Sequence, residues 1–341
     1  MDNTNSYRRL NILNGKFVLT AKSRAKRPWL GIIEPVQEIK LPSYDEKCNL
    51  CPGTIRSNGT KNNVYGNTFV FINDVPSLLN TEDSEEMLNS NLFKQYIERG
   101  VCEVLCYTPV HNKTMVTMSI EEIYEVIMMW QSRYVELGSK DFINHVQIFE
   151  TRGAEMGNSQ PHPHGQIWAQ ESIPTLPSIE IERQQEYYVK NNKVMLEAYL
   201  KHELKTKERI IFESDVFVIL MPFWADWPFE TLILPKSQLT SIDELNEDQS
   251  YDLAKTLSIL AKTYATFFER PLYGAPYMGI HQKPTDGNEY PYIRFHIHFE
   301  PPLLTPNRLK YQASYEKFAE SQRDITVEDA AARLRKITEQ L

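Results

Sequence analysis

Apolar and polar positions along the chain predict a series of strands interrupted by amphipathic helices. The first two strands are the arms of a hairpin around Asn14-Gly15, which is a strong turn signal. Polar and acidic residues 80–98 predict an irregular loop. The remaining strands are expected at 67–74, 101–109, 144–150, 164–170, 217–224, 230–238, 276–282 and 292–301, and the helices at 119–138, 241–268 and 326–340.

The second half of the chain repeats the order of elements found in the first half. In each half a strand, a long helix and two strands follow one another, and each ends in a His-x-His pair, at 162–164 and at 296–298. Equivalent histidines such as His164 and His298 are 134 residues apart, so an internal duplication explains the pattern. We expect an α+β protein with two halves, 1–175 and 176–341, each a mainly antiparallel sheet with packed helices.

Composition and charge narrow the class of protein. Hydrophobic residues make up 41% and charged residues 24% of the 341 positions, which is typical of a folded globular chain. The 37 Lys and Arg against 45 Asp and Glu give a net charge of −8, which argues against a nucleic-acid-binding protein. No apolar run approaches the roughly 18 residues of a membrane span, and the first residues lack the apolar core of a signal peptide. We expect a cytoplasmic protein that binds neither nucleic acid nor membrane.

Cysteine and histidine residues form two candidate metal sites. Cys48 and Cys51 have the spacing of half a tetrahedral zinc site, and imidazoles such as His111 and His162 are candidates for the other ligands, which spacing alone does not select. A turn with two free thiols is the alternative. A second site, which would suit zinc or iron better than magnesium or calcium, could combine a carboxylate with His281, His296 and His298. A buried, hydrogen-bonded histidine cluster is the alternative there.

The passage GNSQPHPHGQIW, which begins at Gly157, carries the most chemical information. Gly157 and Gly165 allow a phosphate to approach the main chain, and the proline between the two histidines removes a backbone donor. If His162 binds metal, His164 keeps an ordinary pKa of about 6.5, is largely neutral at pH 7 and can attack phosphorus. Gln166, on the same strand face, can donate to a phosphate oxygen. The alternative role of His164 is that of a second structural ligand.

Several motifs follow one another along almost the whole chain. They are RAKRPW from residue 24, CxxC from 48, FIND from 71, HPHGQIWA from 162, PFWADWPFETLILPK from 222, FHIHFEPPLL from 295 and SYEKFAESQRD from 314. In this order they resemble the galactose-1-phosphate uridylyltransferase family of the histidine-triad superfamily. A single His-x-His pair would be weak evidence, whereas the ordered set is specific.

The resemblance implies the activity of a UDP-glucose–hexose-1-phosphate uridylyltransferase in galactose metabolism, working by ping-pong chemistry. His164 would attack the α-phosphorus of UDP-glucose, release glucose 1-phosphate and carry the uridylyl group, which galactose 1-phosphate would then accept. Gln166 would stabilise the intermediate and the transition states through its amide. The two halves would be histidine-triad-like, with a zinc site and the nucleophile in 1–175 and a second metal site and a hexose-contacting segment in 176–341.

The same resemblance implies ligands for two structural metals and a set of substrate contacts. The zinc ligands would be Cys48, Cys51, His111 and His162, and the ligands of a second ion, iron or zinc, would be Glu180, His281, His296 and His298. Glu180 is assigned by its place before the RQQEYY stretch. The substrate contacts would be Arg24, Arg27, Asn73, Asp74, Thr151, Gly157, Asn158, Ser159, Lys310, Tyr311, Tyr315, Glu316 and Gln322. Arg24 and Arg27 would reach the substrate in the partner subunit of a homodimer with shared active sites.

The chain departs from the family pattern in segments expected to line the phosphate and hexose pockets. Asn158-Ser159-Gln160 replaces Cys-Ser-Asn, Thr151 replaces Asn, and Ala313-Ser314 replaces Val-Gly. These changes affect donor geometry and sugar preference more than the chemistry. Two alternatives are a relative that forms the same histidine adduct from an ADP-sugar, with phosphate or water as acceptor, and a non-catalytic nucleotide-binding module.

Overall fold

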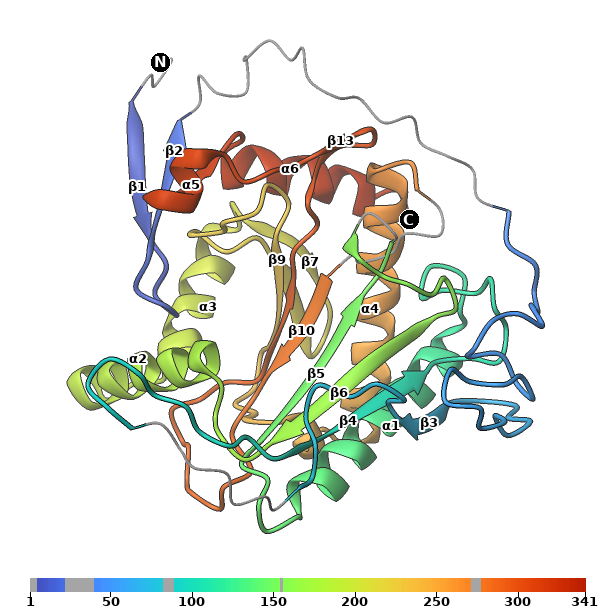
Figure 1. The fold of residues 1–341 in the computed structure, drawn as a ribbon. Coiled ribbons are helices and arrows are strands. Elements are labelled where there is room, and N and C mark those ends of the chain that lie inside the picture. Colours follow the sequence, from blue (N-terminus) through green and yellow to red (C-terminus); the bar gives the residue numbers. More distant parts are fainter. Residues whose placement is uncertain (1–4, 22–39, 82–88, 154–155, 271–276) are drawn as a thin grey trace.

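A nine-stranded antiparallel sheet forms the centre of the computed structural model, which describes residues 5–21, 40–81, 89–153, 156–270 and 277–341 (Figure 1). Its strand order is β3-β4-β6-β5-β10-β11-β9-β8-β7. The strands are β3 (Phe69–Ile72), β4 (Gly100–Cys106), β5 (His145–Thr151), β6 (His164–Gln170), β7 (Ile210–Glu213), β8 (Phe217–Leu220), β9 (Thr231–Pro235), β10 (Tyr277–His281) and β11 (His296–Phe299). Together with the helices described below, the sheet confirms the predicted α+β class.

The strand order has the symmetry expected of an internal duplication. Strands β3, β4, β6 and β5 of the first half correspond to β8, β9, β11 and β10 of the second half. The last strand of the first half-sheet, β5, pairs antiparallel with the first strand of the second, β10, with Ile148 opposite Ile280. The sheets of the two halves therefore join edge to edge into one continuous sheet.

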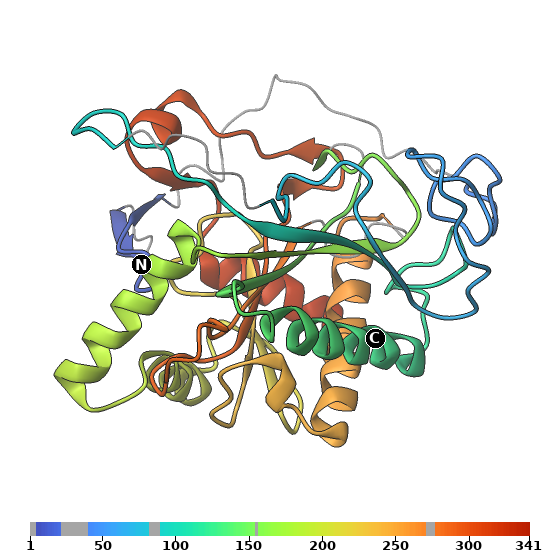
Figure 2. The ribbon, with the colours of Figure 1, turned by 60° about the horizontal axis from the view of Figure 1, so that its bottom comes forward.

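A row of isoleucines shows how the two half-sheets share one core. Six isoleucines, each with 0% of its surface exposed, stand opposite one another on adjacent strands: Ile167, Ile148, Ile280, Ile297, Ile233 and Ile219. Branched side chains in direct cross-strand register pack well on a pleated sheet. The helices α1 (Ile120–Gly138), α4 (Glu247–Phe267) and α6 (Val327–Thr338) contribute to the same core, with α1 and α4 in contact (Figure 2).

The two long helices begin at side-chain caps. A capping box begins α1, with the Ser119 side chain accepting from the Glu122 amide and the Glu122 side chain accepting from the Ser119 amide. Asn246 and Gln249 form the same motif at the start of α4. The helix predicted over 241–268 is therefore divided into a 3₁₀ turn, η3 (Ile242–Glu244), and α4, because the cap at Asn246 starts a new helix.

Two helices that the sequence analysis missed, α2 (Thr175–Asn191) and α3 (Met195–Thr206), lie by the second half of the sheet. Helix α3 packs Leu196 and Leu200 in a core with Leu232 of β9, which points away from the isoleucine row. The buried residues of α2 are Glu180 and Gln184. Because the buried side of α2 is polar, apolar periodicity does not reveal it.

Segments near the two ends of the chain pair in a three-stranded sheet. Strands β1 (Ser6–Leu10) and β2 (Phe17–Ala21) form the predicted hairpin, and Gly15 in its turn has a φ of +75°. Strand β14 (Ser321–Arg323) pairs in parallel with β2, so the red C-terminal segment lies beside the blue hairpin in Figure 1. The segment between β11 and β14 contains β12 (Leu303–Thr305), β13 (Arg308–Leu309) and α5 (Ser314–Phe318).

The polar stretch 80–98 is irregular where the structure describes it, as predicted. Residues 80–81 and 89–98, the described part of the polar stretch, form no helix or strand. Arg24 and Arg27 lie outside the described residues. Among the helices described, none has the length and apolar character required to cross a membrane.

Candidate active site and metal clusters

One face of the sheet carries the residues expected to perform the chemistry. In β6 the side chains alternate between the two faces, and Ile167 belongs to the isoleucine row. His164, Gln166 and Trp168 therefore point to the opposite face of the sheet. Thr151, at the end of β5, lies on this same face because it is two residues from Phe149, which stands opposite Gln166.

His162 lies just before β6 and is not part of the strand, although it is only two residues from His164. The strand begins at His164. Pro163 has no N–H for the strand ladder, although its carbonyl accepts a hydrogen bond from the Tyr107 amide at 3.0 Å. The His162 side chain contacts Cys51 instead, with Nδ1 at 3.6 Å from the sulfur.

The hydrogen bond of His164 determines which ring nitrogen is free. Its Nδ1 lies 2.8 Å from the carbonyl oxygen of His162, and a carbonyl oxygen only accepts, so Nδ1 carries the proton. The lone pair is therefore on Nε2. Burial lowers the pKa of His164 to about 4, below the ordinary value expected from the sequence, so the ring is neutral at pH 7.

The structure brings together the four residues expected to bind zinc. One ligand atom from each of Cys48, Cys51, His111 and His162 lies within 4.8 Å of the others, and all four residues are buried. The Nδ1 atoms of both histidines are 3.6 Å from the Cys51 sulfur. Burial raises the pKa of Cys48 to about 12, so a cation is needed to stabilise the thiolate form.

Neighbouring groups orient this first cluster. Nε2 of His162 donates to the carbonyl of Thr108 at 2.8 Å, which leaves Nδ1 unprotonated and directed at Cys51. The hydroxyl of Thr54 donates to the carbonyls of both Cys48 and Cys51 at 2.7 Å, and this holds the turn between the cysteines. The donor set and its orientation fit a tetrahedral metal ion.

The structure also brings together the second expected set, Glu180, His281, His296 and His298, within 4.8 Å. Strands β10 and β11 place His281 opposite His296, and α2 supplies Glu180. Glu180 lies 2.8 Å from Nδ1 of His281 and 3.6 Å from Nε2 of His296. Burial alone would raise the pKa of Glu180, but its interaction with His281 holds this pKa well below its usual range.

Unpartnered nitrogens indicate that this second cluster also suits a metal ion. Nδ1 of His296 donates to the Arg294 carbonyl at 2.8 Å, so its Nε2 carries a lone pair. That Nε2 and both ring nitrogens of His298 are buried without a hydrogen-bond partner. Buried polar atoms without partners are costly, and a metal ion would satisfy them.

The sequence analysis did not single out two carboxylates beside His298. Glu230 and Glu300 each place an oxygen within 4.8 Å of a ring nitrogen of His298 and of each other. Burial is the main cause that raises the pKa of Glu230 to about 8, and repulsion from the Glu300 carboxylate adds to it. Burial also raises the pKa of Glu300 to about 7. Only the position of Glu300, two residues after His298 in the strand predicted over 292–301, was a signal in the sequence.

The residues expected to contact the nucleotide lie in two segments. Asn73 accepts from the Val75 amide at 3.0 Å, and Asp74 accepts from the Ser57 hydroxyl at 2.8 Å. The second segment joins β5 to β6 and contains Gly157, Asn158 and Ser159. Gly157 has a φ of +84°, a backbone conformation that favours glycine.

The expected hexose contacts separate into a buried and an exposed group. Nζ of Lys310 donates to both oxygens of Glu316, at 2.8 and 2.9 Å, and to the Gln322 carbonyl at 3.3 Å. Tyr311 and Tyr315 are exposed. Among the described residues, no hydrogen bond or ion pair links either group to His164 or Gln166.

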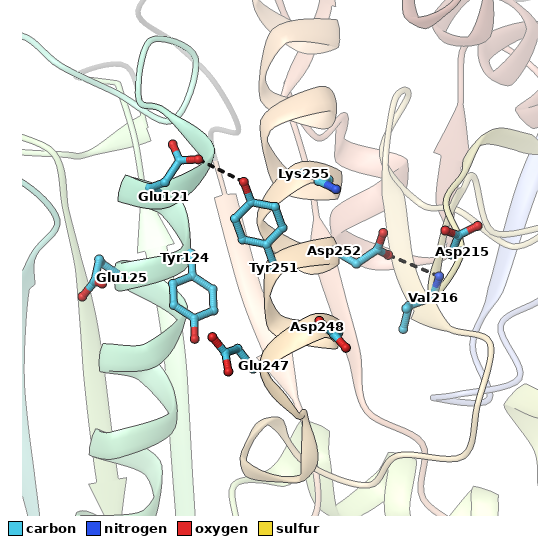
Figure 3. Close-up of a pocket in the computed structure, with 10 residues that line it drawn as sticks. All are labelled: Glu121, Tyr124, Glu125, Asp215, Val216, Glu247, Asp248, Tyr251, Asp252 and Lys255. Carbon is cyan, nitrogen blue, oxygen red and sulfur yellow. Dashed lines mark hydrogen bonds between the residues drawn. The ribbon is translucent and has the colours of Figure 1, made fainter.

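A groove of about 580 Å³ opens elsewhere, between the first turns of α1 and α4 (Figure 3). Tyr251 donates to Glu121 at 2.9 Å, and Asp252 accepts from the Val216 amide at 3.2 Å. Because these helices cover the isoleucine row, the groove is remote from the face of the sheet that carries His164. The residues that line it are Glu121, Tyr124, Glu125, Asp215, Val216, Glu247, Asp248, Tyr251, Asp252 and Lys255.

The arrangement around His164 is suited to covalent transfer of a phosphorus-centred group. A neutral imidazole with a free Nε2 can attack phosphorus, and the amide of Gln166 on the same face can stabilise the charge that develops. Two clusters of side chains that could hold a metal ion accompany this pair. Fold and site together define a candidate group-transfer enzyme with a histidine nucleophile.

Comparison with known proteins identifies the family. The model of the galactose-1-phosphate uridyl transferase N-terminal domain matches residues 1–174, and that of the C-terminal domain matches residues 180–341. The galactose-1-phosphate uridylyltransferase of Haemophilus influenzae is 44% identical over 98% of this chain and 95% of its own length. The Schizosaccharomyces pombe protein of the same name is 40% identical over 97% of this chain and 94% of its own length. The chain belongs to the galactose-1-phosphate uridylyltransferase family.

Solved structures show the same fold. A uridylyltransferase structure covers 98% of this chain and 99% of its own, with a TM-score of 0.77 and 22% identity. An ADP-glucose phosphorylase from Arabidopsis thaliana, solved with bound ADP-glucose, covers 97% of this chain and 98% of its own, with a TM-score of 0.76 and 22% identity. The fold is therefore shared by proteins whose names refer to different nucleotides.

Proposed function

We propose that this protein transfers UMP between UDP-glucose and galactose 1-phosphate in galactose metabolism, through a uridylyl-histidine intermediate. The observation that carries the proposal is the hydrogen bond from Nδ1 of His164 to the His162 carbonyl, which leaves Nε2 as a neutral nucleophile. Relatives with 44% and 40% identity over nearly the whole chain carry the name of this activity.

The reaction has two displacements at one phosphorus atom. The Nε2 lone pair of His164 attacks the α-phosphorus of UDP-glucose, the bond from this phosphorus to the bridging oxygen breaks, and glucose 1-phosphate leaves with the electron pair. A phosphate oxygen of galactose 1-phosphate then attacks the same phosphorus, the P–N bond breaks, and UDP-galactose forms. Gln166 donates to a non-bridging oxygen as negative charge develops in each step.

We also propose a structural zinc ion on Cys48, Cys51, His111 and His162. Two thiolates and two imidazoles are a common zinc donor set. A second structural ion, iron or zinc, would be held by Glu180, His281, His296 and His298, because imidazole and carboxylate ligands suit both metals. Each ion would supply the positive charge that its buried ligands require and hold together segments distant in the sequence.

The other expectations stay predictions. They are a homodimer with shared active sites, a cytoplasmic location, two histidine-triad-like halves at 1–175 and 176–341, and a protein that binds neither nucleic acid nor membrane. The substrate contacts also stay predictions, and these are Arg24, Arg27, Asn73, Asp74, Thr151, Gly157, Asn158, Ser159, Lys310, Tyr311, Tyr315, Glu316 and Gln322.

Intact-protein mass spectrometry after brief incubation with UDP-glucose tests the function. We expect a uridylyl adduct on the parent protein that galactose 1-phosphate removes, and no adduct on H164A. His202 is exposed on α3, so H202A is a matched control that should still form the adduct. An adduct from ADP-glucose alone would contradict the proposal and favour an adenylyl-transferring relative. Full turnover by H164A would exclude His164 as the nucleophile.

A further inference from the structure

The orientation of the Gln166 amide is determined by a neighbouring indole. Nε1 of Trp168 lies 3.1 Å from Oε1 of Gln166. An indole N–H can only donate a hydrogen bond, so the atom of Gln166 that faces it must be the oxygen. The NH₂ of the same amide therefore points away from the Trp168 N–H and is available as a donor.

The indole is itself held in place. Its ring packs edge-on against Phe149, with ring centroids 5.5 Å apart and an angle of 83° between the planes. Phe149 stands directly opposite Gln166 on β5, so the three side chains share one face of two paired strands. Strand β6 is paired on both sides, with β5 and with β4, which limits movement of the backbone that carries Gln166 and Trp168.

We propose that Trp168 is a positioning residue for the transfer reaction, because its indole N–H keeps the Gln166 amide turned with the NH₂ toward the phosphoryl group. This inference rests on the function proposed above. If the amide turned over, Oε1 would face the phosphoryl oxygens, and two groups of negative partial charge would repel one another. Trp168 would thus act through Gln166, without contacting the substrate.

The magnitude follows from the value of a single oriented hydrogen bond. Losing one neutral hydrogen bond that orients a transition-state donor corresponds to a decrease in rate of about 3- to 10-fold. We expect W168F, which keeps a ring against Phe149 but has no N–H, to lower the rate of uridylyl transfer by this factor. Its KM for UDP-glucose should change less than about 2-fold, because the donor matters most when charge develops in the transition state.

A double-mutant cycle separates positioning from general damage. The rate of uridylylation would be measured in a single turnover for the parent, W168F, Q166A and the double variant. We expect the W168F substitution to lower the rate of uridylylation when it is made in the parent protein. Made in Q166A, it should have no further effect on this rate, because no amide remains to be oriented. The matched control is W224F, since Trp224 packs on Tyr199 in the core between α3 and β9 and should not affect the rate.

The outcomes distinguish this inference from the proposed function. If the parent forms no uridylyl adduct, the proposed function fails, and the inference fails with it. If the parent transfers normally and W168F matches W224F, the inference alone is overturned. It is also overturned if W168F slows Q166A as much as it slows the parent. Circular dichroism and metal content check the fold of W168F, and W168Y provides a second aromatic variant without an indole N–H.

Discussion

The buried guanidinium of Arg323 links the C-terminal segment to the segment between β8 and β9, and the stability that this link contributes can be predicted. The Arg323 side chain is 1% exposed and donates to the carbonyl oxygens of Ile325, Ala225, Trp227 and Pro228. Three of the four carbonyls belong to the segment between β8 and β9. The guanidinium therefore joins that segment to β14, the strand to which Arg323 belongs. We consider the substitution Arg323→Met, which keeps most of the volume and removes all the donors.

The expected cost is set by the acceptors that remain. The Trp227 carbonyl still accepts from the Glu230 amide at 3.3 Å, so the substitution leaves the carbonyls of Ile325, Ala225 and Pro228 without the Arg323 donor. A buried acceptor left without its partner costs about 1–3 kcal/mol, so three carbonyls cost at least about 3 kcal/mol. Removing a buried charge offsets part of this cost, since burial lowers the pKa of Arg323 to about 10. We therefore expect R323M to lower the free energy of unfolding by about 3–5 kcal/mol, which is large for a single substitution.

Urea unfolding of the metal-loaded protein, followed by far-UV circular dichroism, measures this difference. The matched control is R333M, because Arg333 is exposed on α6 and its removal should change stability by less than about 0.5 kcal/mol. R323K retains a charged donor and should lie between the two. If R323M unfolds within about 1 kcal/mol of R333M, the carbonyl clamp does not stabilise the fold and the reasoning is wrong.

Three further predictions concern pH, metal and packing. Burial alone would raise the pKa of Glu328, but hydrogen bonds from Arg9 lower it. Its stabilising effect is therefore complete above the ordinary pKa of 4.5 and is lost as the pH falls through the lowered pKa. Urea titrations should show E328Q less stable than the parent at pH 7, with a difference that shrinks as the pH is lowered below 4.5. C51A should lose one equivalent of zinc by metal analysis and unfold at a lower temperature, and unchanged zinc content would exclude Cys51 as a ligand. In G165A the new Cβ would lie 2.2 Å from the Tyr107 hydroxyl, so we expect a loss of about 1–3 kcal/mol, and wild-type stability would show that Tyr107 moves freely.

Local patterns were sufficient to predict most strands, the two long helices and the motifs. The capping box at Ser119 and the hairpin at Gly15 depend on residues a few positions apart, so the sequence contains the whole signal. Helix α2 escaped prediction because the buried residues on it are the polar Glu180 and Gln184, so it has no apolar stripe to detect. Glu230 escaped for a related reason, since it lies 68 residues before His298 and meets it only in the folded sheet.

The amino-acid sequence by itself determined the class of fold, the duplicated order of elements and the identities of the candidate site residues. The tertiary structure decided how they combine: β5 joins β10, β14 pairs with β2, and the residues of each candidate metal site converge from separate segments. It also decided that Nε2 of His164 is the free nitrogen and that Oε1 of Gln166 faces Trp168. The physical reason is that periodicity and capping act between near neighbours, whereas strand pairing, ligand convergence and hydrogen-bond direction depend on groups that only folding brings together.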